Sequence, residues 1–174
     1  VIETSLSSHG MVSAPHQLAA QAGVRILEDG GNAIEAMVAA AAAMTVLYPH
    51  MNAMGGDNFW LIHNNGKVMA IDACGASAAA ANPKYYFDRG LDEIPARGPL
   101  AAVTVAGAPS GWQAALEISF TYGGRFSLSR LFEDAIHFAR NGIPVAATLH
   151  RNASDKFSEL RKIHGFADVF LPEG

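Results

Sequence analysis

The chain has 174 residues, of which 50% are hydrophobic, 9% aromatic and 16% charged, and its formal net charge is −4. This is the composition of one ordinary globular domain that is long enough to bury a real core. The acidic balance argues against a nucleic-acid partner, and the single cysteine, Cys74, excludes an internal disulfide and a multi-cysteine zinc site.

Two helices are predicted near the start of the chain. Apolar residues recur at helical spacing over residues 17–29, and two glycines then end the pattern. Asn32 is a good N-cap for a second helix, with Glu35 placed as in a capping box. Residues 36–48 form an apolar run too short for the roughly 20 residues of a membrane span. The run therefore predicts a helix buried on all sides and no membrane span, and it leaves the compartment open.

A β-hairpin is predicted next. Residues 59–63 have the pattern of a buried strand, residues 64–66 (NNG) that of a hairpin turn, and residues 67–72 that of an antiparallel partner. The glycines at 55–56 belong to no complete phosphate-binding motif, so a tight turn before the strand is the better interpretation. Helices followed by a hairpin favour an α+β fold.

The second half of the chain is predicted to be mainly helical. Residues 74–82 are small and alanine-rich, which favours a close-packed extended segment or loop, and residues 103–107 favour a short strand. Helices are expected at about residues 112–122, 131–140 and 147–163.

The last residues, 166–174, pass from an apolar stretch into a turn. A complete domain more often finishes with a docked element or a polar tail. We therefore expect residues 1–174 to be a single incomplete domain, part of a larger folding unit.

Spacing alone identifies no catalytic constellation. The seven histidines show neither the H-x-x-x-H nor the H-E-x-x-H pattern, so no metal site is predicted. Cys74, at a strand end among alanines, is more typical of a small buried residue than of a nucleophile. Ser110 lies in the sequence GAPSG, which is not the G-x-S-x-G elbow, so a turn or cap role fits it better.

Several short motifs nevertheless follow one another along the chain, and their order is informative. They are GMVSAPH at 10–16, AAQAGVRIL at 19–27, GGNAIEA at 30–36, PH at 49–50, GGDNF at 55–59, GK at 66–67, VTVAGAPSGW at 103–112, DAI at 134–136, ARNG at 139–142 and VFL at 169–171. This succession resembles the opening of the large subunit of gamma-glutamyltranspeptidases over nearly the whole chain. The GGDNF and VTVAGA forms are more similar to the amidohydrolase-like branch of that family.

The resemblance implies an N-terminal-nucleophile hydrolase with a four-layer αββα sandwich, made as one precursor that cleaves itself into a large and a small subunit. The small subunit would be the partner of this chain and would carry the catalytic N-terminal threonine. No catalytic residue, metal or cofactor is then expected in these 174 residues. The substrate would be a small-molecule amide or gamma-glutamyl-like compound, and the resemblance leaves room for a higher oligomer.

The resemblance also implies a substrate-binding position in this chain. In the family, an arginine just after the strand that corresponds to residues 67–72 binds the α-carboxylate of the gamma-glutamyl group. One alignment places Cys74 at that arginine, and the alignment to the amidohydrolase-like branch places Ala76 there, with Gly75 between them. Both alignments remove the arginine. Whether Arg89 or Arg97 folds back to replace it is left open.

Two classes of function remain. The first is an amide hydrolase or acyltransferase whose substrate is not a standard gamma-glutamyl compound, with a cephalosporin-acylase-like or oxamate-amidohydrolase-like specificity as variants. The second is a non-catalytic structural remnant or scaffold subunit of the same family. Either way, we expect that this chain is not a stable catalytic unit by itself.

Overall fold

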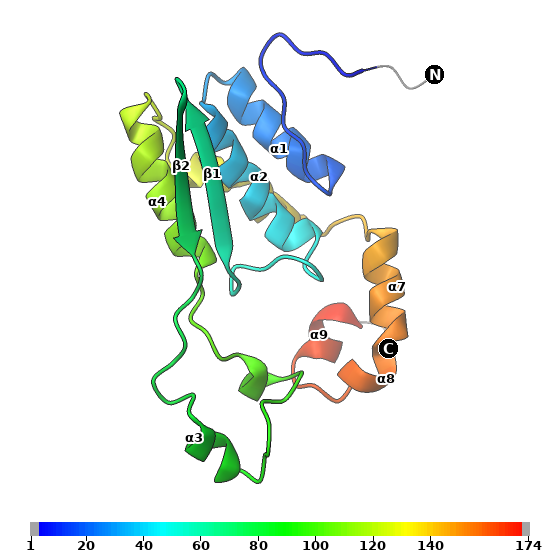
Figure 1. The fold of residues 1–174 in the computed structure, drawn as a ribbon. Coiled ribbons are helices and arrows are strands. Elements are labelled where there is room, and N and C mark those ends of the chain that lie inside the picture. Colours follow the sequence, from blue (N-terminus) through cyan, green and yellow to red (C-terminus); the bar gives the residue numbers. More distant parts are fainter. Residues whose placement is uncertain (1–3, 172–174) are drawn as a thin grey trace.

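A computed structural model describes residues 4–171 of the chain, and Figure 1 shows their arrangement. Helices α1 (Gln17–Glu28) and α2 (Ala33–Leu47) pack against each other. Strands β1 (Asn58–Asn64) and β2 (Lys67–Ala73) form an antiparallel hairpin that packs on α4 (Ala108–Thr121). The remaining elements are α3 (Pro83–Phe87), a 3-10 turn (Pro99–Ala101), α5 (Leu128–Leu131), α6 (Glu133–Asn141), α7 (Ala147–Asp155), α8 (Phe157–Leu160) and α9 (Phe166–Phe170).

The capping box expected at the start of α2 is confirmed. Asn32 Oδ1 accepts hydrogen bonds from the backbone N–H groups of Ile34 and Glu35, both at 3.0 Å, and Glu35 Oε2 accepts from Asn32 N at 2.9 Å. The other oxygen of Glu35 accepts from the N–H groups of Arg125 and Phe126, each at 2.7 Å. Because Glu35 is only 1% exposed, one buried carboxylate joins the start of α2 to the segment before α5.

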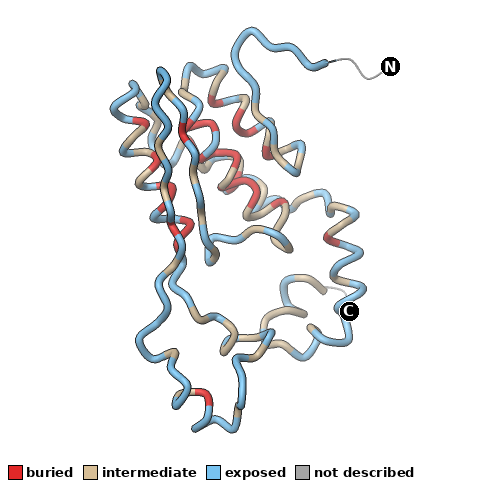
Figure 2. Tube along the Cα trace, viewed as in Figure 1, coloured by how far each residue is buried: buried red, intermediate tan, exposed pale blue. Residues whose placement is uncertain are grey.

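Most of helix α2 is buried, as its small apolar side chains predicted (Figure 2), but Ala33 and Met37 in its first turns are exposed. It lies against α1, α4, α5 and α6. Small residues allow neighbouring helices to approach closely, so this region forms the main core of the described chain. The buried residues of that core are Ile26, Ala36, Val38, Ala39, Ala42, Ala108, Trp112, Leu131 and Ala135.

The hairpin and its turn are confirmed, but the prediction of a buried strand is wrong for one of its faces. The turn residues Asn65 and Gly66 both have positive φ, +47° and +77°, as a tight hairpin turn requires. Ile62 packs against α2 and α4, whereas Phe59 and Leu61 are 66% and 77% exposed. Because side chains alternate across a strand, only one face meets the helices.

Tertiary structure also changes several expected boundaries in the second half. The expected strand at 103–107 is reduced to a single bridge between Ser77 and Thr104, and α4 begins four residues earlier than predicted. The helices expected at 131–140 and 147–163 are each interrupted. Phe132 and Lys156 have ψ near 0° (1° and 2°), outside the helical range, and end one helix where the next begins. The predicted turn at 172–174 lies outside the described residues.

None of the helices within residues 4–171 combines the length and apolar character that crossing a membrane requires.

Candidate functional site

The segment that follows β2 changes its pairing partner. The β1–β2 register ends at the pair Asn58 and Ala73, after which the chain leaves β1. It pairs instead with residues 103–105, where Val105 N donates to Ala76 O at 2.9 Å and Ala78 N donates to Val103 O at 3.0 Å. Residues 74–76 therefore lie where the chain stops pairing with β1 and begins to pair with residues 103–105.

Gly56 and Asp57 form hydrogen bonds to the two segments that meet at this change of pairing partner. Gly56 O accepts hydrogen bonds from Gly107 N at 3.0 Å and from Ala108 N at 2.9 Å, which fixes the start of α4. Asp57 Oδ1 accepts from Gly75 N at 3.0 Å, which fixes the segment after β2. The turn expected before β1 is therefore also a junction between segments that are distant in sequence.

Glycine is required where these segments cross. A Cβ atom at Gly75 would lie 1.7 Å from Val105 O, and one at Gly107 would lie 1.9 Å from Ala73 O. Both distances are far below a van der Waals contact, so neither position can carry a side chain unless the backbone moves. Gly55 differs, since a Cβ there would have no neighbour within 4 Å.

Cys74 is exposed, which corrects the prediction that it is a small buried residue. The inward-facing position at this end of β2 is taken by the buried Ala73, so the next residue faces away from the helices. Cys74 Sγ lies 3.7 Å from Asp57 Oδ2, and Cys74 N donates to Asp72 Oδ1 at 2.9 Å. The negative charge of Asp57 is the main cause that raises the pKa of the Cys74 thiol, so the thiol stays protonated at neutral pH and is not an activated nucleophile.

The structure thus brings Cys74 and Gly75 together with a residue that sequence reasoning did not single out, Asp57, while Ala76 pairs with Val105. The available signal was its position directly before β1. Extending the hairpin register by one pair puts Asp57 opposite Cys74.

The two arginines that could have replaced the missing guanidinium are bound elsewhere. Arg89 lies over the ring of Tyr85, 3.7 Å from its centroid, and donates to Tyr85 O at 2.9 Å. Arg97 Nε donates to Glu159 Oε1 at 2.9 Å. Within the described residues, neither guanidinium is hydrogen-bonded to residues 74–76.

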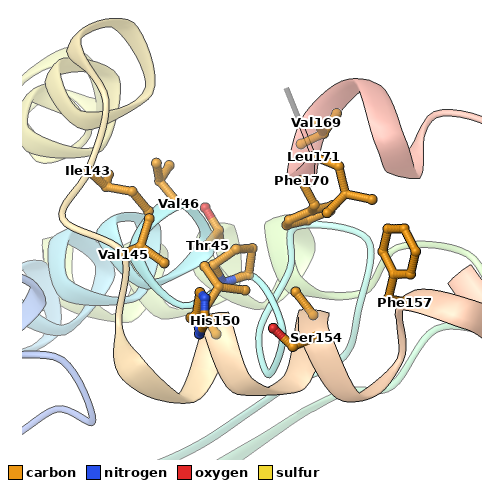
Figure 3. Close-up of a pocket in the computed structure, with 13 residues that line it drawn as sticks. Thr45, Val46, Ile143, Val145, His150, Ser154, Phe157, Val169, Phe170 and Leu171 are labelled. Carbon is orange, nitrogen blue, oxygen red and sulfur yellow. The ribbon is translucent and has the colours of Figure 1, made fainter. Parts of the chain in front are cut away.

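A second feature is a cavity of about 860 Å³ between the end of α2, α7 and α9 (Figure 3). Its lining is almost wholly apolar, with Thr45, His150 and Ser154 as the polar side chains. No hydrogen bond joins His150 to Ser154 in the described structure, and none of the described lining residues is a carboxylate. The cavity therefore offers no activated nucleophile.

Within residues 4–171, no three His, Cys, Asp or Glu side chains are grouped so that they could hold a metal ion.

The sequence model of the gamma-glutamyltranspeptidase family matches residues 19–174, which is most of the chain. The chain belongs to the gamma-glutamyltranspeptidase family.

Relatives within this family include the oxamate amidohydrolase proenzyme of Klebsiella pneumoniae subsp. pneumoniae. It is 50% identical over 173 residues, which cover 98% of this chain and 32% of that protein. The resemblance to the amidohydrolase-like branch is therefore confirmed. The chain spans about a third of the length of the curated relatives it matches.

Solved structures of gamma-glutamyltranspeptidases confirm the α+β fold as a portion of the family's N-terminal-nucleophile hydrolase architecture. Gamma-glutamyltranspeptidase from Helicobacter pylori superposes with a TM-score of 0.81 at 28% identity, covering 93% of this chain and 46% of that one. Cephalosporin acylase from Bacillus halodurans gives a TM-score of 0.73 at 34% identity, covering 83% and 26%. The named family members are hydrolases, acylases and transpeptidases, so this is a family of enzymes.

Proposed function

We propose that this chain is the N-terminal part of the large subunit of a self-processing amide hydrolase or acyltransferase. The preferred acyl donors of that enzyme lack an α-carboxylate. Several relatives are named as proenzymes, which supports synthesis as a precursor that is cut into two subunits. Residues 1–174 would then be one incomplete domain of that precursor, completed by the remainder of the protein.

The observation that carries this proposal is the chemistry at residues 74–76. Neither Cys74 nor Ala76 offers a guanidinium, and the carboxylate of Asp57 lies within 3.7 Å of the Cys74 thiol. An anionic group approaching Cys74 would meet a negative charge where other family members are expected to present a positive one. A neutral acyl group meets no such repulsion.

The nucleophile would come from the small subunit. The raised pKa of Cys74 keeps its thiol protonated, which supports a reaction that does not use this cysteine. An N-terminal threonine of the small subunit, activated by its own α-amine, is the nucleophile that the resemblance implies.

The outer face of the hairpin supports the need for a partner. Phe59, Leu61 and Val68 are 66%, 77% and 63% exposed and share this face. Adjacent large apolar side chains at a sheet surface are typical of a protein interface. We assign this face to contact with the rest of the processed enzyme.

The test is kcat/KM of the complete two-subunit enzyme for a gamma-glutamyl anilide and for simple acyl anilides. A charge-assisted hydrogen bond contributes about 1.5–3 kcal/mol. Loss of the arginine is therefore expected to lower kcat/KM for the gamma-glutamyl donor about tenfold to hundredfold. Ala76→Arg is expected to improve the gamma-glutamyl donor. Cys74→Arg is expected to gain less, because Asp57 would pair with the new guanidinium.

Two results would count against the proposal. A strong preference of the unmodified enzyme for gamma-glutamyl donors, improved by neither arginine, would overturn the missing-arginine argument. No turnover of any acyl anilide by the complete, processed protein would favour the non-catalytic scaffold instead.

A further inference from the structure

At the end of the hairpin, the backbone N–H of Gly75 has no partner in the β1–β2 ladder. The last paired residues are Asn58 and Ala73, so Asp57 and Cys74 are the next to face each other. The chain turns there toward residues 103–105, which removes Gly75 N from the β1 ladder. The Asp57 carboxylate accepts this N–H at 3.0 Å and so bridges the gap that the turn creates.

We propose that Asp57 is a positioning residue that fixes residues 74–76 as one wall of the acyl pocket, an inference that rests on the proposed function of those residues. The Gly75 N–H donates to one oxygen of its carboxylate and the Cys74 thiol lies beside the other, so a single side chain sets the place of two consecutive residues.

Gly75 is held from two directions. Its N–H donates to Asp57, and its α-carbon lies so close to Val105 O that a Cβ atom would be only 1.7 Å from it. Movement toward residues 103–105 is therefore blocked by backbone, while movement away from β1 breaks the bond to Asp57. Removing the carboxylate frees the second movement only, which makes its contribution separable from that of the glycine.

Asp57 is itself well anchored. Its neighbour Gly56 accepts the N–H groups of Gly107 and Ala108, so the carboxylate is carried on a turn that is fixed to the start of α4. The position of residues 74–76 is thereby tied to a long helix rather than to a free loop. Groups that line a site are positioned best when their supports are rigid.

The charge of Asp57 has a second consequence for the same wall. It raises the pKa of the Cys74 thiol, and a protonated thiol is a poor nucleophile. An exposed cysteine at the wall therefore does not compete with the nucleophile of the small subunit for the acyl group.

Three variants of the full-length protein test the proposal. Asp57→Ala removes the acceptor and the charge. Asp57→Asn keeps an acceptor oxygen at nearly the same place without the charge. Asp57→Glu keeps the charge but displaces the carboxylate by one methylene. Asp88→Asn is the matched control, since Asp88 pairs with the exposed Lys84 on α3.

The first measurement is hydrogen exchange of a peptide that spans residues 73–78. We expect faster exchange in Asp57→Ala and Asp57→Glu, and exchange close to that of the unmodified protein in Asp57→Asn and Asp88→Asn. Alkylation of Cys74 provides a second readout that needs no substrate. It should accelerate at least about threefold at pH 8 in both Asp57→Asn and Asp57→Ala, because loss of the carboxylate lowers the pKa of the thiol.

The third measurement separates KM from kcat for a neutral acyl anilide. Asp57→Ala is expected to raise KM about tenfold and to change kcat less than about threefold, while Asp57→Asn stays within about threefold of the unmodified enzyme in both. Unchanged exchange and unchanged KM in Asp57→Ala would overturn the proposal, as would an Asp57→Asn enzyme as impaired as Asp57→Ala.

These outcomes are distinct from failure of the proposed function. If no amide is turned over, hydrogen exchange and alkylation still decide whether Asp57 holds residues 74–76. If amides are turned over but Asp57→Ala behaves as the unmodified enzyme, the proposed function stands and the role of Asp57 is rejected. Should Asp57→Ala fail to mature, Asp57→Glu takes its place, with the same rise in KM expected.

Discussion

The region around α2 and the end of the hairpin each depend on a carboxylate that accepts backbone N–H groups from a distant segment. Glu35 is 1% exposed and binds the N–H groups of Asn32, Arg125 and Phe126 inside the core. Asp57 is exposed and accepts the N–H of Gly75 at the surface, where the hairpin ends. The same kind of interaction thus stabilises the fold in one region and sets the shape of a surface in the other.

The region around α2 and the hairpin also differ in how completely they are packed. Most of α2 is buried within the chain (Figure 2), whereas the hairpin is covered by helices on one face only and leaves Phe59 and Leu61 exposed. The outer face of the hairpin is therefore the surface that the proposed partner would cover.

The largest effect is expected where backbones cross. Gly107→Ala would place a Cβ atom 1.9 Å from Ala73 O, so the segments must separate, with an expected loss of about 3 kcal/mol or more of folding free energy. Thermal unfolding of the full-length protein, together with the yield of processed subunits, measures this loss. Gly55→Ala is the control and should change little, because its Cβ would have open space. Equal effects of the two substitutions would disprove the steric argument.

Glu35→Ala tests the buried carboxylate, and we expect its loss of folding free energy to be the second largest. It leaves the N–H groups of Asn32, Arg125 and Phe126 without their acceptor in a buried place, which is expected to cost about 3 kcal/mol of folding free energy. Chemical denaturation of the full-length protein measures it. Glu35→Gln keeps one acceptor oxygen and should lose less. A smaller loss than for Asp57→Ala would reverse the contrast between the two carboxylates.

Leu61→Thr sharpens the contrast between the covered and the open face. In residues 1–174 alone it should raise solubility, because Leu61 is 77% exposed there. In the complete enzyme it should lower stability by about 1–2 kcal/mol, because the same side chain would be buried against the partner. Lys67→Thr, at the start of β2, is the control and should change neither quantity. Unchanged stability of the complete enzyme would show that this face has no partner.

The smallest expected effect concerns the two carboxylates near Cys74. The charge of Asp57 contributes most to the raised pKa of the thiol, and that of Asp72 contributes least. Alkylation of Cys74 in the full-length protein between pH 7 and 9 should therefore accelerate more in Asp57→Asn than in Asp72→Asn. The advantage should shrink as the pH rises, because the thiol of the unmodified protein then ionises as well. The opposite order would mean that Asp72 lies closer to the sulfur in solution.

Local patterns predicted the elements whose causes are local. The capping box of Asn32 and Glu35 and the turn at Asn65 and Gly66 depend on neighbouring residues, so the sequence was enough to find them. The breaks at Phe132 and Lys156 have no glycine or proline to mark them, so no short sequence pattern predicted them.

The candidate site was predicted only in part for the same reason. Family resemblance pointed to residues 74–76, but the contribution of Asp57 arises from a contact across 18 positions in sequence. The exposure of Cys74 was missed because its alanine neighbours resemble a buried segment, whereas its orientation depends on which face of β2 meets the helices.

The burial of α2 also bears on the order in which the chain folds. Helices α1 and α2 are neighbours in sequence and in space, so they can pair as soon as both have been synthesised (Figure 1). Other parts of α2 pack against α4, α5 and α6, and the last of these helices ends at Asn141. During synthesis a strongly apolar helix must therefore wait, partly uncovered, until that residue has left the ribosome, which makes this interval the period in which the nascent chain is most exposed to aggregation and to chaperones.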